Sequence, residues 1–459
     1  MNNMKKLLSI LILCFCFSSF IQGKVKLPAM MGDHMILQQN SSVKLWGWAD
    51  NKKVTVTTSW NNQTYQVLTD KNGAWLVKVD TPGASYTPYS ITISDGEDVI
   101  LSDILIGEVW ICSGQSNMDM RMMGNTGQPI DRSLETILHA GNYRNRIRFI
   151  AVSRTKDAQQ RIDFEGRKWE VSAPEAVMTC SAVAYFFAKQ VTEVLDIPVG
   201  LVISSWGGSR IESWMNEKTL ASIDGVDIEA ARSSKLKMHH RLGCMYDTML
   251  WPVRNFTARG FLWYQGESNI FNYYCYAPMM TAMVQLWREV WEAPNMPFYY
   301  VQIAPHKYKD SQDTDAALLR EAQIKALEII PNSGMVSTAD IGDEFCIHPP
   351  QKDVVGLRLA TLALTKTYNI CGLPSTGPTM TKVNYSEGKA IVTFDNASAG
   401  LTPAFCNLKG FEIAVKEGEA SSIMTSYNPI NGHWTSSNYD LNTTILRGEW
   451  GYEGIVMTD

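Results

Sequence analysis

ILIGEVWICSGQSNM, residues 104–118, is the stretch that decides the fold. Its apolar run ends at Gly114, and a serine flanked by two amides follows at once as Gln115, Ser116 and Asn117. A continuous apolar run that stops at a glycine predicts a strand buried on both faces of a sheet. In α/β proteins ligands gather at the carboxyl ends of such strands, so Ser116 is a candidate site residue.

The surrounding segment, 106–374, alternates predicted strands and helices. Further buried strands are expected in PVGLVISSW (198–206) and RGFLWYQGESN (259–269), and a helix in SAVAYFFAKQVTEVLD, capped by Ser181. This alternation predicts an α/β domain with a parallel sheet covered by helices on both faces. The polar turns that follow these strands are therefore expected at one edge of the sheet.

The segments on either side have a different character. Residues 24–105 contain short strands rich in Val, Thr, Tyr and Trp between turn residues, which predicts an N-terminal β-sandwich. The chain becomes β-like again after this α/β region, so we expect a partial β domain over 375–414.

The first residues have the pattern of a targeting segment. Lys5 and Lys6 precede an apolar run over 7–17, and Gly23 offers a small residue for cleavage. We therefore expect a signal peptide over 1–23 and export to the periplasm or the medium. The run is short for a bilayer, and no later segment predicts a membrane span.

The composition excludes few functions, but it bears on which kinds of partner the protein can bind. The 459 residues carry a net charge of −5, which gives no argument for a nucleic-acid partner. The 14 tryptophans fit either large cores or sugar-stacking surfaces. The nine cysteines form no C-x-x-C pair, so we expect no metal site. We also expect no cofactor. Nothing indicates an oligomeric state.

A serine acts as a nucleophile only beside a base and beside donors for the oxyanion that forms on attack. At a helix start Ser116 is also a good cap, and the local pattern leaves both readings open. Other strand ends offer Gly207 and Gly208, while His348 lies in a loop before a predicted helix. With His348 as the base, we expect the rate to decline as the pH falls through about 6.5.

Several blocks together resemble one known family. Residues 24–414 resemble the sialate O-acetylesterase family, within the SGNH-type carbohydrate esterases, in VKLWGWA, GEVWICSGQSNM, GGSRIESWM, WYQGESN and IHPPQKDVVGLRLA, in this order. The resemblance implies a flavodoxin-like hydrolase domain. It also implies an esterase that removes O-acetyl groups from sialic acid or other acetylated carbohydrates through an acetyl-serine intermediate.

The resemblance assigns roles to single positions. It implies Ser116 as the nucleophile and His348 as the base. The oxyanion donors would be the Ser116 N–H, the N–H of Gly208 or Gly207, and the Gln265 side chain.

The acid of the triad is left open. Many SGNH enzymes carry aspartate three residues before the histidine and some relatives carry it two before, but here these positions are Phe345 and Cys346. The remaining carboxylates are Asp340, Asp343 and Glu267. We favour Glu267 over Asp343, and a Ser–His dyad helped by a backbone carbonyl is the third option.

Arg210 has two interpretations. It can bind the carboxylate of a sialic acid substrate, or it can form an internal salt bridge with Glu212 or another acid.

The tail, 415–459, departs from the esterase pattern. MTSYNPINGHWTS and LRGEWGYEGIVMTD resemble a fragment of glycoside hydrolase family 3, the β-glucosidase type, in which the residue matching Asp459 is the nucleophile. A fragment of this length cannot bury a core of its own and supplies no partner acid, so we expect it to be non-functional. A β-glucosidase and a non-catalytic glycan-binding protein remain as alternatives to the esterase.

Overall fold

The computed structural model describes residues 25–308, 314–386 and 389–397, and short segments between 422 and 457. The chain divides into two compact units, Met1–Leu373 and Pro374–Asp459. The expected signal peptide and Asp459 lie outside the described residues.

A parallel sheet forms the centre of the first unit, as the alternating pattern predicts. Its parallel strands lie in the order β13, β12, β11, β7, β10, β8, and β9 adds an antiparallel edge. Their bounds are β13 (Ser333–Val336), β12 (Phe298–Val301), β11 (Gly260–Tyr264), β7 (Asp98–Gly114), β10 (Val199–Ser205), β8 (Ile147–Ala151) and β9 (Glu170–Val171).

The register of the three central strands brings their carboxyl ends to the same level. Gly114, the last residue of β7, pairs with Tyr264 of β11 and with Ser205 of β10, which are also the last residues of their strands. The turns that follow the three strands therefore start side by side at one edge of the sheet.

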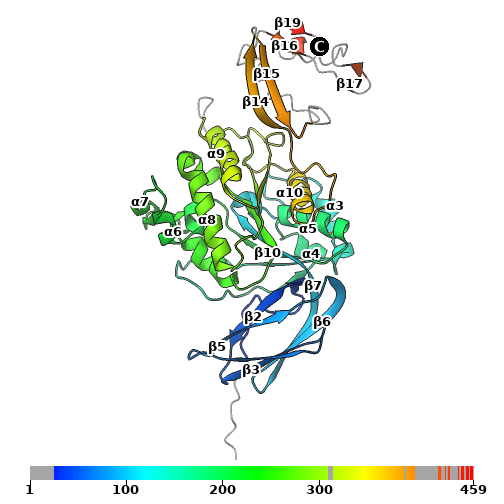
Figure 1. Ribbon diagram of the computed structural model, residues 1–459, viewed down its shortest axis with the longest axis vertical. Helices are drawn as coiled ribbons and strands as arrows, with labels where there is room; N and C mark the ends of the chain where they lie inside the picture. Colours follow the sequence, from blue (N-terminus) through cyan, green and yellow to red (C-terminus); the bar gives the residue numbers. More distant parts are fainter. Residues whose placement is uncertain are drawn as a thin grey trace, which may run out of the picture. The chain divides into compact units, whose positions relative to one another are not determined.

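Helices cover both faces of this sheet, as Figure 1 shows. On one face α5 (Ala182–Leu195) and α10 (Lys352–Lys366) pack against Trp110 and Cys112 of β7. On the other face α8 (Tyr276–Val290) and α9 (Asp315–Ile329) share a core with Ile111. Neighbouring residues of β7 thus enter different cores, which explains why its residues 109–112 are all apolar.

The predicted cap of α5 is confirmed, because the Ser181 Oγ accepts a hydrogen bond from the Ala184 N–H at 3.2 Å. The shorter helical segments are α2 (Ser116–Asp119), α3 (Ser133–Leu138), η1 (Ala140–Tyr143), α4 (Pro174–Val177), η2 (Ile211–Trp214), α6 (Glu217–Ala221), α7 (Ile228–Arg232), η3 (Met238–His240), η4 (Tyr246–Leu250), η5 (Trp251–Val253) and η6 (Glu267–Cys275).

The N-terminal β region joins the parallel sheet through β7. The first half of β7 pairs with β1 and β6, and the second half pairs with β10 and β11. The boundary expected between residues 105 and 106 therefore falls inside one continuous strand. The remaining strands are β1 (Ile36–Gln38), β2 (Ser42–Trp48), β3 (Lys53–Thr58), β4 (Thr64–Leu68), β5 (Ala74–Asp80) and β6 (Ser85–Ser94), of which β2 and β5 form a separate pair.

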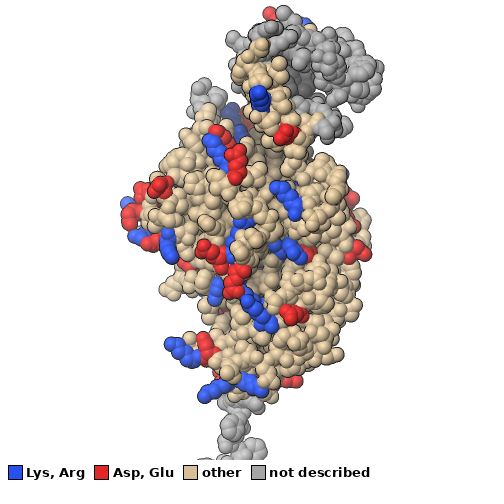
Figure 2. Space-filling view, viewed as in Figure 1, with Lys and Arg blue, Asp and Glu red and all other residues tan. Residues whose placement is uncertain are grey.

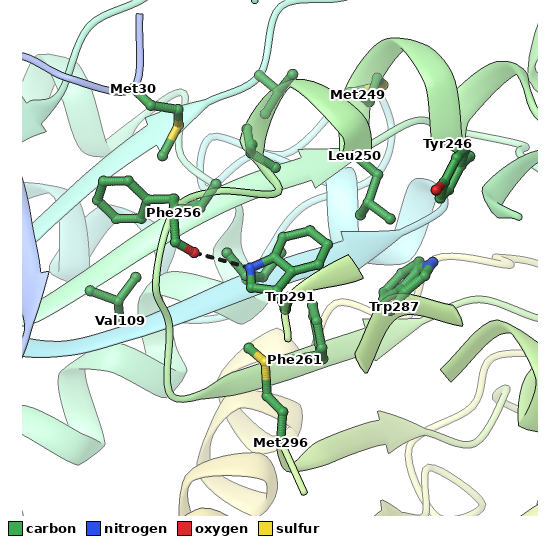
Figure 3. Close-up of a cluster of buried hydrophobic side chains, with 14 of the residues drawn as sticks. Met30, Val109, Tyr246, Met249, Leu250, Phe256, Phe261, Trp287, Trp291 and Met296 are labelled. Carbon is green, nitrogen blue, oxygen red and sulfur yellow. Dashed lines mark hydrogen bonds between the residues drawn. The ribbon is translucent and has the colours of Figure 1, made fainter. Parts of the chain in front are cut away.

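Aromatic side chains fill the core that the two regions share, shown in part in Figure 3. Trp291 donates its indole N–H to the Phe256 carbonyl at 3.0 Å. The Phe261 ring contacts both Trp291 and Trp287, with ring centroids 5.2 Å apart in each pair. Met30, which precedes the first strand, belongs to the same core, so the N-terminal region is packed onto the α/β region.

The second unit is described in pieces. The antiparallel hairpin of β14 (Thr379–Ser386) and β15 (Lys389–Asp395) lies in the segment expected to be a partial β domain. In the tail, Leu446 and Tyr452 are buried against each other. The tail strands are β16 (Ser422–Met424) paired with β19 (Ile455–Met457), and β17 (Pro429–Ile430) paired with β18 (His433–Trp434).

Charges of both signs are interspersed on the face of the first unit that Figure 2 shows. This face carries no extended patch of one sign, in keeping with the small net charge of −5.

One buried carboxylate ties three regions of the first unit together. Glu108 of β7 accepts hydrogen bonds from Gln38 at 3.0 Å and Gln39 at 2.7 Å, in the β region. Arg259, just before β11, donates to both of its oxygens at 2.7 and 2.9 Å, and the Tyr368 hydroxyl donates at 2.9 Å from beyond α10. Glu108 is fully buried, so these donors replace the water it loses.

We therefore predict that Glu108→Gln lowers the free energy of unfolding, by roughly 3 kcal/mol, because it removes one charge of a buried ion pair. Urea denaturation measures this change. The control is Glu217→Gln, which removes an ion pair with Arg232 on an exposed helix and is expected to change stability by less than about 1 kcal/mol. Equal losses in the two variants would contradict the role given to Glu108.

Candidate active site

Ser116 occupies a tight turn at the carboxyl end of β7. Gly114 has a φ of 137°, and a Cβ at this position would lie 2.2 Å from the Tyr264 carbonyl oxygen, so only glycine fits. Ser116 then begins α2, and its own N–H makes no hydrogen bond to the described residues. The turn leaves both the hydroxyl and this N–H available for a ligand.

His348 lies against this serine. Its Nε2 is 2.8 Å from the Ser116 Oγ, which allows the hydroxyl to donate its proton to the ring. His348 reaches the serine from the loop that precedes α10. The structure thus brings together the two residues that the sequence analysis paired as nucleophile and base.

The environment of His348 disfavours its charged form. Burial, together with the positive charges of Lys352 and His306, lowers the pKa of His348 from 6.5 to about 4. The ring is therefore neutral at lower pH than the sequence analysis expected.

The turn after β10 completes one side of the site. A Cβ at Gly207 would lie 3.5 Å from the Cβ of Ser116, which places this backbone against the serine. Gly208 has a φ of 74°, in the left-handed region that glycine adopts easily. The N–H groups of Gly207 and Gly208 make no hydrogen bond to the described residues, so both are candidate oxyanion donors with the N–H of Ser116.

Gln265 does not fit the oxyanion role that the resemblance implied. Its side-chain N–H groups donate to the Ser209 carbonyl at 3.0 Å and to the Asn269 side chain at 2.7 Å. Its carbonyl oxygen accepts from the Tyr276 hydroxyl at 2.8 Å. The buried side-chain amide thus makes its hydrogen bonds within the protein and is not free to bind an oxyanion. Its bond to Ser209 supports the turn that carries Gly207 and Gly208.

The two carboxylates weighed as the triad acid also have other partners. Glu267 accepts a hydrogen bond from Asn117 at 2.6 Å. Asp343 accepts from two backbone N–H groups of its own loop, at 2.8 Å each. Among the described contacts neither carboxylate hydrogen bonds to the His348 ring. Neither assignment of the orienting acid is therefore supported by the geometry.

The third carboxylate, Asp340, is held by Arg358. The guanidinium donates to its two oxygens at 2.7 and 2.5 Å. This ion pair joins the segment after β13 to α10.

Sequence reasoning missed a buried network around Asn117, the residue that follows the nucleophile candidate. Its side-chain nitrogen donates to Glu267 and, at 3.1 Å, to the carbonyl of Ile347. Its oxygen accepts from the Lys352 ammonium at 2.5 Å. Because Ile347 precedes His348, this one amide joins the serine turn to the histidine loop.

Burial dominates the titration of the charged groups in this network. It lowers the pKa of Lys352 to about 7 and raises the pKa of Glu267, because each charged form loses water. The shared amide between them offers each group a hydrogen bond.

The other ring nitrogen of His348 has a partner that no sequence pattern signalled. Its Nδ1 lies 3.0 Å from the Oε1 of Gln128, a residue 220 positions earlier in the chain. The side-chain oxygen of an amide thus occupies the place where a triad carboxylate is usual.

Arg210 lies just after the two glycines, with its guanidinium over the Phe271 ring at 4.5 Å. Glu212, its expected alternative partner, instead accepts from Asn269 at 2.8 Å and Asn272 at 2.9 Å. The described residues include no ion pair of Arg210 with Glu212. Arg210 is half-buried, and its buried Nε has no hydrogen-bond partner among the described residues, so the side chain can meet an anionic ligand.

The part of the chain that the structure describes offers no candidate metal site and no candidate membrane-spanning helix. Those residues contain no group of three or more His, Cys, Asp or Glu side chains placed to hold a metal ion. The helices described there are also not long and apolar enough to span a bilayer.

The similarity to a β-glucosidase is short. A β-glucosidase from Ruminococcus albus is 58% identical to this chain, but only over 52 residues, which are 11% of this chain and 6% of that enzyme. Such a match covers a fragment of a glycosidase and does not carry its activity.

The rest of the chain matches carbohydrate esterases. Human sialate O-acetylesterase is 26% identical over 404 residues, covering 80% of this chain and 76% of that protein. The mouse protein of the same name is 26% identical over 432 residues, covering 81% and 79%. The crystal structure of a carbohydrate acetylesterase from Xanthomonas citri superposes with a TM-score of 0.72, at 29% identity and over 81% of each chain.

The family match covers the region that holds the serine, the histidine and the glycine turn. Residues 106–365 match the sequence model of a protein family, the carbohydrate esterases described as sialic acid-specific acetylesterases. The fold and this match agree with the resemblance seen in the sequence. The chain therefore belongs to the sialic acid-specific acetylesterase family of carbohydrate esterases and is a carboxylic ester hydrolase that deacetylates acetylated sugars.

Proposed function

We propose that Ser116 removes acetyl groups from sugar hydroxyls through a covalent acetyl-serine, with His348 as the general base. The observation that carries this proposal is the 2.8 Å contact between the Ser116 Oγ and the His348 Nε2. Acyl transfer also needs donors for the oxyanion, and the N–H groups beside the serine that have no partner among the described residues supply them.

In the first half of the reaction, His348 takes the proton of the Ser116 hydroxyl while the oxygen attacks the acetyl carbonyl. The carbonyl oxygen becomes negatively charged. It is stabilised by the N–H of Ser116 and by the N–H of Gly208 or Gly207. His348 then protonates the sugar oxygen as the ester bond breaks, so the sugar leaves as an alcohol and the acetyl group stays on the serine.

In the second half, water attacks the acetyl-serine carbonyl. His348 accepts a proton from this water, and the same N–H groups hold the second oxyanion. Collapse releases acetate and returns the proton to Ser116. Every step uses groups of the chain and water, and we propose no cofactor.

We propose that Glu267 supports this chemistry through Asn117 rather than by touching the base. The carboxylate and the Lys352 ammonium fix opposite ends of the Asn117 amide. That amide also holds the carbonyl just before His348. Since the serine and the histidine must meet within hydrogen-bond reach, this positioning affects the rate more than substrate binding.

For the substrate, we propose an acetylated sugar whose carboxylate, as in a sialic acid, pairs with Arg210. The guanidinium of the half-buried Arg210 lies over the Phe271 ring, and Arg210 is two residues after Gly208 in the chain. A planar guanidinium binds a carboxylate through two parallel hydrogen bonds, so this pairing would fix the orientation of the sugar.

The glycan-binding alternative rested on the many tryptophans. Several of them are fully buried and belong to the cores, among them Trp110, Trp214, Trp263 and Trp287. Trp206 is half-buried beside the glycine turn and can contact a bound sugar. Binding alone gives no use for a serine hydroxyl hydrogen bonded to a histidine.

We also propose that the protein acts outside the cytoplasm. The support is the pattern of a signal peptide over 1–23, with its lysines, its apolar run and its small residue for cleavage.

The first prediction concerns the nucleophile. Ser116→Ala is expected to lower kcat for an aryl acetate by at least about 1,000-fold, because losing a triad nucleophile removes the covalent route. Acetate release and urea denaturation are measured together. Ser113→Ala is the control and is expected to keep its activity, because Ser113 lies in β7, just before the turn, and its buried hydroxyl has no partner among the described residues. A Ser116→Ala variant with a tenth of the rate would point to another nucleophile.

The second prediction concerns pH. The base must be neutral, and the pKa of His348 is about 4, so kcat/KM is expected to persist from neutrality to pH 5 and to fall as the pH passes below about 4. A pH series with an aryl acetate measures this, with circular dichroism as the check on folding. A midpoint near 6.5, the pKa of an ordinary histidine, would contradict the conclusion that burial and nearby positive charges lower the pKa of His348.

The third prediction tests whether Glu267 or Asp343 orients the His348 ring directly. Glu267→Gln and Asp343→Asn are each expected to keep kcat within about fivefold, because the new amide oxygens still accept the same hydrogen bonds. Steady-state kinetics with an aryl acetate checks this. If either change costs about 10,000-fold, as loss of a triad acid can, that residue orients the base directly.

A further inference from the structure

The turn that carries Gln128 is built firmly. Asn125 and Gln128 exchange backbone hydrogen bonds at 3.0 and 2.9 Å, which closes the turn over 125–128. The side-chain nitrogen of Asn125 also donates to the Gln128 Oε1 at 3.4 Å, which restricts the orientation of the Gln128 side chain. The next segment is anchored to the histidine loop, because the Asp131 N–H donates to the Pro350 carbonyl at 3.0 Å.

The contact between Gln128 and His348 selects one form of the ring. To accept the proton of Ser116, Nε2 must carry a lone pair, so the proton of the neutral ring sits on Nδ1. That N–H needs an acceptor, and the Gln128 Oε1 lies 3.0 Å away. With this bond formed, the ring is in the tautomer and the orientation that the reaction uses.

The other charged or titratable groups near the ring do not supply this acceptor. The Cys346 thiol contacts the backbone carbonyl of His348 and not its ring. Lys352 and His306 are cationic when protonated and disfavour a charged ring. The carboxylates of the neighbouring elements are bound elsewhere, as described for Glu267 and Asp343.

We propose that Gln128 is the positioning residue of His348, a neutral replacement for the acid of a Ser–His–Asp triad. This inference rests on the proposed function of Ser116 and His348. A neutral amide oxygen can fix the tautomer and the angle of the ring, as a carboxylate does. It stabilises the imidazolium less, because it carries no full negative charge.

The test compares two substitutions of Gln128. Gln128→Met keeps the length of the side chain but has no acceptor, and it is expected to lower kcat about tenfold to a hundredfold with little change in KM. Gln128→Glu restores a charged acceptor. It is expected to keep kcat near neutrality and to move the acid limb of kcat/KM to higher pH, because the carboxylate favours the protonated ring.

Thr126→Ala is the matched control, since Thr126 is exposed in the same turn. It is expected to leave kcat and the pH profile as in the wild type. A urea denaturation curve of each variant separates a lost contact from a lost fold.

A second readout does not depend on catalysis. In the Ser116→Ala background, the titration of His348 is followed by NMR with Gln128 and with Gln128→Glu. A shift to higher pH in the Glu variant supports the proposal. An unmoved titration, or a Gln128→Met enzyme with the kcat of the wild type, overturns it. Failure of the proposed function would appear differently, as Ser116→Ala retaining the wild-type rate while the NMR shift is still seen.

Discussion

Ser116 and His348 lie 232 residues apart in the chain, and the side-chain amide of Asn117 ties their two segments together. Asn117 follows the serine directly and donates to the backbone carbonyl just before the histidine. A buried carboxylate and a buried ammonium, those of Glu267 and Lys352, hold the two ends of the amide. Each of these charges costs solvation, and each is compensated by a bond that orients the reacting pair.

The chemistry of the base follows from this arrangement. The carboxylate closest in role to a triad acid, Glu267, is used to hold Asn117, and the ring of His348 is supported by the neutral Gln128 instead. Without a negative partner, and with Lys352 nearby, His348 is a weak base whose pKa lies near 4. Such a ring gains little driving force from proton transfer, but it stays in its active, neutral form over a wide range of pH. Catalysis then depends mainly on the positioning of Ser116 against His348 and on the oxyanion donors.

Parts of this site could be predicted because they depend on local patterns. A buried strand that ends in glycine and serine predicts exposure of Ser116, and the register of β7, β10 and β11 then brings the glycine turn beside it. The geometry does not support the oxyanion role expected for Gln265, because its side chain is buried among Ser209, Asn269 and Tyr276. A strand-end position in the sequence does not show which way a side chain points. No sequence pattern indicated the contact of Gln128 with His348, since it depends on how the turn over 125–128 packs against a loop 220 residues later. The continuity of β7 across the expected domain boundary likewise depends on pairing partners far apart in sequence.

In this mechanism Ser116 takes up the acetyl group, because Asn117 holds the turn of Ser116 against the loop of His348. The most direct measurement is rapid-quench mass spectrometry of the peptide that contains Ser116, in the wild type and in Asn117→Ala, after mixing with an aryl acetate. We expect one acetyl group on Ser116 within the first turnover of the wild type. We expect the same modification, formed at least about tenfold more slowly, in the variant. Acetylation of another residue, or equal rates in the two proteins, would contradict this mechanism.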